Sequence, residues 1–187
     1  VDGKLLAMDS KFVLDDNARN MRNKIEAIEE ERKKLANVLA VEKEKTTITF
    51  VPLGSGEIGL ISDGAGTGML TLDLIYDGGG KVASFCELGG TTSAEVMYRA
   101  MKLTMESGFP IKSILVVLIG GFNRMDDMAN GITGYIKDHK LDIPIFTRMC
   151  GTMEEEGKRI MAEAGLATYY DLTETVNQCI KASLEVK

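Results

Sequence analysis

The chain has 187 residues, of which 44% are hydrophobic, and a formal net charge of −6. A chain of this length and composition can bury one substantial core. The acidic balance, with a pI near 5.0, argues against a nucleic-acid partner or an anionic membrane surface, because either requires a basic face. The sequence has no apolar run long enough to cross a bilayer, so we expect no membrane partner.

The three cysteines, Cys86, Cys150 and Cys179, are odd in number and widely spaced. Their spacing fits neither a disulfide framework nor a metal-thiolate motif, and it is typical of reduced thiols in a cytoplasmic protein. Cys86 and Cys150 lie near the ends of predicted strands, where a cysteine is either a buried filler or a reactive thiol. We therefore expect a cytoplasmic chain without disulfide bonds.

Two segments precede the main part of the chain. Residues 1–20 alternate apolar and polar side chains as a strand does, but they are too few to fold alone. Because this pattern is already under way at Val1, we expect the chain to be a piece of a longer polypeptide. Residues 21–45 are dense in Glu, Lys and Arg and carry a narrow apolar stripe that Arg32 interrupts, which predicts a charged connecting helix. A partner-binding coiled coil is the alternative.

From residue 46 onward, apolar strands alternate with amphipathic helices. The predicted strands are 46–53, 57–62, 82–86, 113–119, 143–148 and 167–170, and the predicted helices are 67–77, 92–106, 124–138, 153–164 and 172–185. Such an alternation implies right-handed crossovers and parallel strands that are covered on both faces. The continuous apolar run SILVVLI suits a central buried strand. We therefore expect residues 46–187 to form an α/β domain with a doubly wound, mainly parallel sheet.

Four glycine-containing turns follow strands of this predicted sheet. In a parallel sheet such turns meet at the carboxyl edge, where these folds bind ligands. Glycines let backbone N–H groups approach a ligand closely, and helix starts favour negative charge, so the edge is suited to a phosphate or a carboxylate. Arg124 and Arg148 add positive charge there. The turns are SDGAGTG (62–68), ELGGTTS (87–93), IGGFNR (119–124) and RMCGT (148–152).

Three of these turns also have a purely structural interpretation. For the three glycines of SDGAGTG, it is tight packing of a helix against a strand. For the second turn, it is a capping box in which Thr92 and Glu95 start a helix. The third turn is equally compatible with a tight strand-to-helix connection. Phe122 favours a ligand or a partner at that turn, because a large apolar side chain on a turn is costly unless something covers it.

The first turn also resembles part of a dinucleotide-binding fingerprint. Gly64 and Gly66 begin the pattern G-x-G-x-x-G, and Glu87 follows the next strand as a ribose-binding acid would, but Met69 occupies the third glycine position. A non-catalytic nucleotide-binding α/β module is therefore an alternative function. Catalytic side chains are scarce, because the one histidine, His139, is predicted at a solvated helix end. The domain is expected to hold a charged ligand and to be unable to transform it unaided.

Four segments occur in a recognisable order and spacing: MDSKFVLDDNA, ISDGAGTGMLTLDLIYDGGGKVASFCELGG, ILVVLIGGFNRMDDMANGI and RMCGTMEEEGKRIMAEAGL. Together they closely resemble the C-terminal half of the β subunit of succinyl-CoA synthetase and its relatives. The resemblance implies that residues 1–20 are the end of an ATP-grasp domain whose bulk lies upstream. Residues 46–187 would then be a CoA-ligase domain of flavodoxin-like fold.

The resemblance implies an activity as well. Enzymes of that family couple cleavage of ATP or GTP to formation of a thioester from a small carboxylic acid and CoA, a reaction of the tricarboxylic acid cycle that passes through an acyl phosphate and a phosphohistidine. The histidine belongs to an α subunit, so an α-type partner and a hetero-oligomer are implied. The nucleotide and Mg²⁺ would be bound mostly by the upstream region and CoA mainly by the partner. This piece alone is expected to be inactive and to hold no catalytic side chain.

Site residues are carried over by matching positions. Asp9 in MDSK matches a Mg²⁺ ligand, and a carboxylate suits a hard cation that bridges phosphates. The helix that starts after GAGTG would face the partner's phosphohistidine and stabilise the phosphoryl group through its dipole and free N–H groups. The positions that match this turn and the other substrate contacts are Asp63, Gly64, Gly66, Gly121, Phe122 and Asn123.

Two positions depart from the family's pattern. Asp63 stands where the family normally has Asn, and its negative charge would weaken binding of an anion unless it is protonated, turned away or used as a helix cap. Phe122 and Asn123 replace a more aliphatic pair, so the acyl substrate need not be succinate. A malate-CoA ligase or an ATP-citrate-lyase-like β subunit is therefore an alternative to a succinate enzyme.

Overall fold

The computed structural model describes residues 48–54, 56–89 and 92–185. The chain divides into two compact units, Val1–Glu44 and Lys45–Lys187. All described residues belong to the second unit. The predicted segments 1–20 and 21–45, and Asp9 with them, therefore lie outside the described residues.

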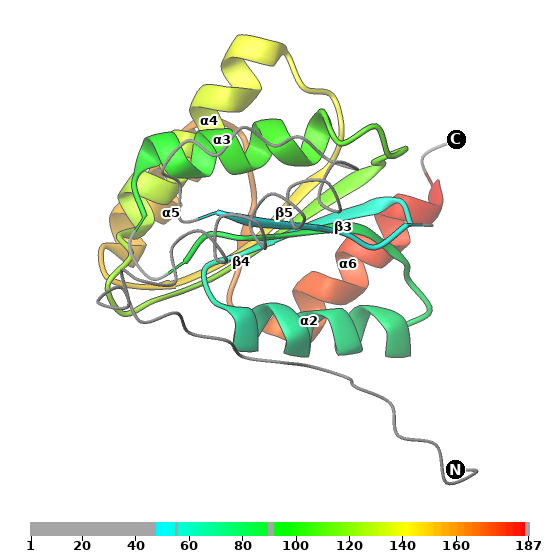
Figure 1. The fold of residues 1–187 in the computed structure, drawn as a ribbon. Helices are drawn as coiled ribbons and strands as arrows, with labels where there is room; N and C mark the ends of the chain where they lie inside the picture. The colour runs from blue at the N-terminus through cyan, green and yellow to red at the C-terminus, as the bar shows by residue number, and fades with distance from the viewer. Residues whose placement is uncertain (1–47, 55, 90–91, 186–187) are drawn as a thin grey trace, which may run out of the picture. The chain divides into compact units, whose positions relative to one another are not determined.

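A six-stranded sheet forms the centre of the second unit (Figure 1). Its strands are β1 (Thr49–Pro52), β2 (Ile58–Ser62), β3 (Val82–Glu87), β4 (Ser113–Gly120), β5 (Ile145–Gly151) and β6 (Thr168–Tyr169). They neighbour one another in the order β1-β3-β2-β4-β5-β6, and only β1 pairs antiparallel with its neighbour. Without β1, this is the strand order of flavodoxin-like folds. The predicted α/β class with a mainly parallel, doubly wound sheet is confirmed.

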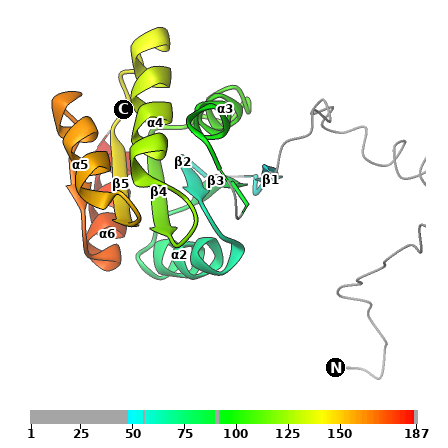
Figure 2. The same ribbon diagram turned by 90° about the vertical axis from the view of Figure 1, so that its left-hand side faces the viewer.

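The helices of the described residues cover both faces of the sheet. They are α2 (Ala65–Asp77), α3 (Ala94–Met105), α4 (Met125–His139), α5 (Glu154–Glu163) and α6 (Leu172–Glu185). Helices α3, α4 and α5 pack in a row on one face, and α2 and α6 lie together on the other, as Figures 1 and 2 show. The sheet is therefore buried between two helical layers, as the alternation of strands and helices predicts.

Most element boundaries differ from the predicted ones by one to three residues, and two of these differences concern the glycine turns. Helix α2 begins at Ala65 instead of residue 67, because Gly64 is extended (φ −171°, ψ 142°) and acts as the N-cap. Strand β5 continues to Gly151 instead of residue 148, because Gly151 still pairs with Gly120 at the end of β4. In both places a neighbouring residue decides the boundary, and the local apolar pattern does not record it.

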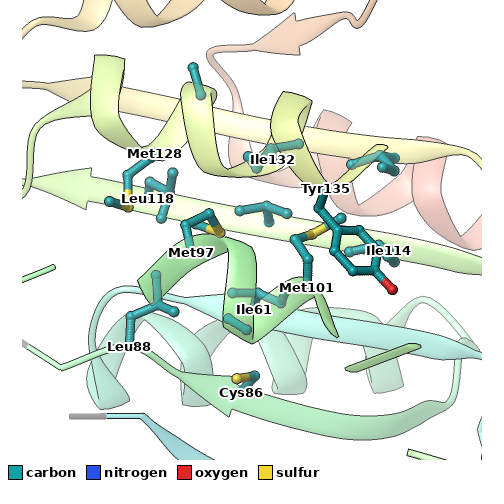
Figure 3. Packing of buried hydrophobic residues seen from close by; sticks show 14 of the residues in the cluster. Ile61, Cys86, Leu88, Met97, Met101, Ile114, Leu118, Met128, Ile132 and Tyr135 are labelled. Atoms are coloured by element: carbon teal, nitrogen blue, oxygen red, sulfur yellow. The ribbon is translucent and has the colours of Figure 1, made fainter. Parts of the chain in front are cut away.

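The hydrophobic core lies on both sides of β4, the strand predicted to be central. Leu115 and Val117 pack toward α2 and α6, while Ile114, Val116 and Leu118 pack toward α3, α4 and α5, and all five side chains are fully buried. Figure 3 shows the cluster between the sheet and helices α3, α4 and α5, in which methionine side chains of α3 and α4 fill the space over the sheet. Because β4 is apolar on both faces, it anchors both layers at once.

Helices α3 and α4 approach each other closely at one glycine. A Cβ atom added at Gly131 would lie 2.5 Å from the carbonyl oxygen of Ala94 and 2.7 Å from the Cβ of Met97. At Gly134, one turn further along α4, the nearest atom would be a ring carbon of Tyr98 at 3.7 Å, which is an ordinary contact. Only the first position requires the absence of a side chain for the helices to pack.

This difference gives a matched pair of variants in one helix. Gly131→Ala should lower the free energy of unfolding by about 1–3 kcal/mol, because the methyl group forces the α3 backbone away. Gly134→Ala should stay within about 1 kcal/mol of the wild type and on the stabilising side, because alanine favours the helix. Urea unfolding followed by circular dichroism measures both. Equal unfolding midpoints for the two variants would contradict the close approach.

Candidate functional site

The candidate site lies at the carboxyl edge of the sheet, where β2 and β4 end beside each other. Because β2 to β6 are parallel, the turns that follow them all reach this edge, as predicted. From β2 the chain crosses to β3 on one side, and from β4 it crosses to β5 on the other. The chain thus reverses its direction of winding between β2 and β4, which is the topological switch point at which such folds bind ligands.

The three glycines of the β2–α2 turn have different surroundings. A Cβ atom at Gly64 or Gly66 would meet nothing within 4 Å, whereas one at Gly68 would lie 2.2 Å from the ring of Phe85. Gly68 is therefore the packing glycine, and the structural interpretation holds for it alone. Gly64 and Gly66 leave the backbone open on the side where a ligand would approach.

The start of α2 is uncapped. The first N–H groups of any helix lack acceptors within the helix, and the N-cap Gly64 has no side chain to supply one. The hydroxyl group of Ser62 donates to the carbonyl oxygen of Gly64 (2.7 Å) and so stabilises the turn from the side of β2. Open N–H groups at a helix start form a site for a negatively charged group.

The carboxylate of Asp63 points into the protein rather than toward the start of α2. Asp63 is 9% exposed, and both of its carboxylate oxygens lie 3.0 Å from the backbone nitrogen of Ile119, whose N–H donates to them. Burial raises the pKa of Asp63, while the N–H of Ile119 and the side chain of Asn123 act in the opposite direction. Of the three ways for this charge to tolerate an anion nearby, turning away is the one that the geometry shows.

The β4–α4 turn presents an open and a closed side. Gly121 is exposed, with nothing within 4 Å of an added Cβ atom, and the side chain of Phe122 is 91% exposed. Asn123 is 4% exposed, and its Oδ1 accepts a hydrogen bond from the backbone N–H of Thr92 (3.1 Å). The structure thus places Gly64, Gly66, Gly121 and Phe122 at the surface, and Asp63 and Asn123 behind them.

The turn after β3 is tied to itself. The side chain of Glu87 accepts a hydrogen bond from the N–H of Gly89 (3.0 Å), so this predicted ribose-binding acid serves its own turn. Helix α3 is capped by Ser93, whose hydroxyl group accepts from the N–H of Val96 (3.4 Å). The predicted capping residue, Thr92, is wrong by one position. Its backbone N–H instead reaches across to Asn123.

The two predicted arginines differ in how their positive charge is compensated. Arg124 pairs with Asp126 (2.6 Å) and Asp127 (3.8 Å), which largely offset its charge. The Nε of Arg148 donates to the backbone oxygen of Tyr170 (3.1 Å), and its Nη1 is buried without a hydrogen-bond partner among the described residues. Arg148 is therefore the stronger contributor of positive charge to the edge.

Two of the three thiols are buried and the histidine lies far from the glycine turns, whereas Cys150 belongs to the fourth turn. Burial raises the pKa of Cys86 and of Cys179 to about 12, whereas Cys150 is half-buried near the end of β5. His139 is exposed at the far end of α4, where its ring stacks on Tyr135 with a centroid distance of 4.3 Å. Neither Cys86 nor His139 is placed to act on a ligand at the carboxyl edge.

The described residues contain neither a membrane-spanning helix nor a metal-binding cluster. None of their helices is both long enough and apolar enough to cross a membrane. They contain no group of three or more His, Cys, Asp or Glu side chains that could hold a metal ion. Asp9, the predicted Mg²⁺ ligand, is not among these residues and stays a prediction.

Comparison with known proteins identifies the class of domain. The sequence model of the CoA-ligase family matches residues 61–181, which begin in β2 and end in α6 and so contain the whole candidate site. The chain belongs to the CoA-ligase family. The resemblance to succinyl-CoA synthetase β subunits is thereby confirmed at the level of the family.

Particular relatives are β subunits of succinate–CoA ligases. The chain is 34% identical over 180 residues to the ADP-forming β subunit of Desulfurococcus amylolyticus, covering 96% of this chain and 46% of that protein. It is 36% identical over 160 residues to the GDP-forming β subunit of Thermus thermophilus, covering 86% of this chain and 41% of that protein. The chain thus spans about half the length of the curated relatives it matches.

Solved structures show the same fold at lower sequence identity. ATP citrate lyase from Methanothrix soehngenii superposes with a TM-score of 0.60 at 17% identity, over 94% of this chain and 49% of that chain. A dinucleotide-forming acetyl-coenzyme A synthetase from Ca. Korarchaeum cryptofilum superposes with a TM-score of 0.58 at 16% identity, over 73% of this chain and 34% of that chain. At these identities the likeness supports the fold alone.

The thiol environments predict a selective chemical reaction. At pH 8, a thiol-specific disulfide reagent should modify Cys150 in the folded chain and leave Cys86 and Cys179 intact, because thiols with a pKa of about 12 are almost wholly protonated. Denaturant should expose all three. The Cys150→Ser variant should lose the native reaction. Modification of Cys86 as fast as Cys150 would contradict this expectation, because it would show that the hydrophobic core around Cys86 opens to the reagent.

Proposed function

We propose that the chain is the CoA-ligase part of the β subunit of an NTP-dependent acyl-CoA ligase. In this proposal the complete enzyme forms a thioester from a small carboxylic acid and CoA, through a phosphohistidine carried by an α-type partner subunit. The family match and the similarity to succinate–CoA ligase β subunits support the reaction class. The geometry at the start of α2 supports the part that this chain plays.

One observation carries that part of the proposal: α2 alone among the described helices has no acidic residue in its first turn. The other helices carry Glu95 in α3, Asp126 and Asp127 in α4, Glu154, Glu155 and Glu156 in α5, and Glu174 in α6. Acidic side chains there offset the positive end of the helix dipole. The start of α2 keeps its dipole for an external anion, and we assign that anion as the partner's phosphoryl group.

The partner would cover apolar surface next to this helix start. Phe122 is 91% exposed and Ile119 is 50% exposed, and both lie in or beside the β4–α4 turn. Apolar side chains of this size at the ligand edge are suited to an interface or to the apolar part of a substrate. The partner would also have to supply the histidine, because His139 lies at the opposite end of α4.

The remaining requirements of the reaction fall outside the described residues. We propose that Asp9 contributes a Mg²⁺ ligand, that ATP or GTP binds mostly to an upstream ATP-grasp region, and that CoA binds mainly to the partner. A succinate enzyme, a malate-CoA ligase and an ATP-citrate-lyase-like enzyme share these requirements. They differ in the acid that lies beside Gly121 and Phe122.

A charge placed at the start of α2 tests the proposal. In the complete enzyme, Gly66→Asp should lower phosphorylation of the partner histidine by labelled NTP by about tenfold or more, because the carboxylate repels the phosphoryl group and opposes the dipole. Asn130→Asp adds the same charge on the exposed side of α4 and should have no such effect. The 187-residue chain alone should show no ligase activity and should form a complex with the α-type subunit in light scattering.

Two outcomes would contradict the proposal. Full phosphorylation in the Gly66→Asp enzyme would show that the start of α2 does not face the phosphoryl group. If the complete β chain and the α-type subunit remain separate monomers after mixing, the proposed partnership is wrong.

A further inference from the structure

The β5–α5 turn is joined to the β4–α4 turn through one residue, Thr152. The backbone N–H of Thr152 donates to the carbonyl oxygen of Gly120 (3.1 Å), and its carbonyl oxygen accepts from the N–H of Met125 (2.9 Å). The hydroxyl group of Thr152 donates to the carbonyl oxygen of Gly121 (3.2 Å). The hydrogen bonds of this single residue therefore follow the β4–α4 turn from the end of β4 to the start of α4.

The backbone next to Thr152 shows how firmly the two turns are joined. A Cβ atom added at Gly151 would lie 2.1 Å from the carbonyl oxygen of Gly120, so the turns are in direct backbone contact. Met153 has a φ of +60°, a left-handed conformation that residues other than glycine seldom adopt. Such a conformation persists only where the surrounding structure determines it. At Met153 the two constraints are the hydrogen bonds of Thr152 and the start of α5 at Glu154.

The hydroxyl hydrogen bond supplies what the shape of the β4–α4 turn does not. Gly121 has no side chain, and a Cβ atom placed there would meet nothing within 4 Å. The side chain of Phe122 is almost fully exposed, so its packing does not hold the turn either. The N–H of Gly121 donates to the carbonyl oxygen of Ile119 (3.1 Å), and its own carbonyl oxygen accepts from Thr152. The orientation of the peptide between Gly121 and Phe122 therefore depends on hydrogen bonds.

The same hydrogen bond decides where the next N–H group points. The peptide between Gly121 and Phe122 is trans, so its C=O and N–H groups point in opposite directions. With the oxygen of Gly121 turned toward Thr152, the N–H of Phe122 is turned away from the β5–α5 turn. Within the part of the chain that the structure describes, this N–H has no hydrogen-bond acceptor. It is a donor that a ligand can use.

We propose that Thr152 is a positioning residue, whose hydroxyl group fixes the Gly121–Phe122 peptide and with it the donor that this turn presents to a ligand. Thr152 acts through Gly121 and does not itself contact the ligand. The inference rests on the proposed function, in which the acid lies beside Gly121 and Phe122. It gives the fourth glycine turn a part in the site.

Three variants separate the hydroxyl group from the rest of the residue. Thr152→Val keeps a branched side chain and every backbone hydrogen bond but removes the hydroxyl donor, whereas Thr152→Ser keeps that donor. Thr133→Val is the matched control, because it removes a hydroxyl group that donates to the carbonyl oxygen of Ala129 (2.8 Å) within α4. Thr152 is exposed, so the valine variant is expected to fold.

The orientation of the Phe122 N–H gives the first readout. Its residual dipolar coupling, measured by NMR on the 187-residue chain, reports the direction of this bond relative to the sheet. In Thr152→Val the coupling should change well beyond the scatter among the amides of β2 and β4, because the peptide is no longer held. In Thr152→Ser and Thr133→Val it should keep the wild-type value.

Kinetics of the complete enzyme give the second readout, with succinate, malate and citrate each tried as the acid. Thr152→Val should raise the KM for the acid that is turned over by about tenfold, because a hydrogen bond to a carboxylate is lost from its place. The KM for ATP or GTP and the labelling of the partner histidine should stay at the wild-type level. Thr152→Ser should restore the KM for the acid, and Thr133→Val should leave it unchanged.

The two readouts distinguish this inference from the proposed function. An unchanged coupling in the folded Thr152→Val chain would overturn the positioning role and leave the proposed function untouched. An equal loss in kcat and in the KM for every substrate would also overturn it, because the hydroxyl group would then serve stability in general. A changed coupling, together with a complete enzyme that turns over none of the three acids, would refute the proposed function only.

Discussion

The parallel pairing of β2, β4 and β5 is the constraint on which the candidate site depends. Ser62 lies in register with Val117, and Gly120 with Gly151, so these strands end close together at one edge. Each strand then delivers the start of a helix to that edge. A register shift of one residue would turn every alternate side chain of β4 to the opposite layer. The packing of both layers therefore fixes the place at which the turns meet.

Helix starts alone do not select a binding site, because every helix of a doubly wound sheet contributes one. The selection comes from side chains that are absent or turned away. Helices α3 to α6 carry their own acids in the first turn, while α2 has none and begins at a glycine. The acid that precedes α2, Asp63, is directed to Ile119. The positive end of one helix is thereby left for a ligand.

Periodicity was sufficient to predict the fold class, the order of the elements and the edge at which the glycine turns meet. It could not predict which glycine packs and which remains open, because that depends on Phe85, a residue of a neighbouring strand. The antiparallel direction of β1 and the extension of β5 to Gly151 likewise depend on pairing partners. The direction of the Asp63 side chain is set by an N–H that lies 56 positions later in the chain.

Asp63 and Asn123 both lie at positions that depart from the family's pattern, and both side chains are buried. Each accepts a backbone N–H from a neighbouring strand end or turn, Asp63 from Ile119 and Asn123 from Thr92. A buried carboxylate requires a donor, and the N–H of Ile119 supplies it. A buried amide oxygen requires a donor as well, and the N–H of Thr92 supplies it to Asn123. A negative charge beside an anion site is therefore compatible with binding, because the interior of the protein, and not the ligand, meets it.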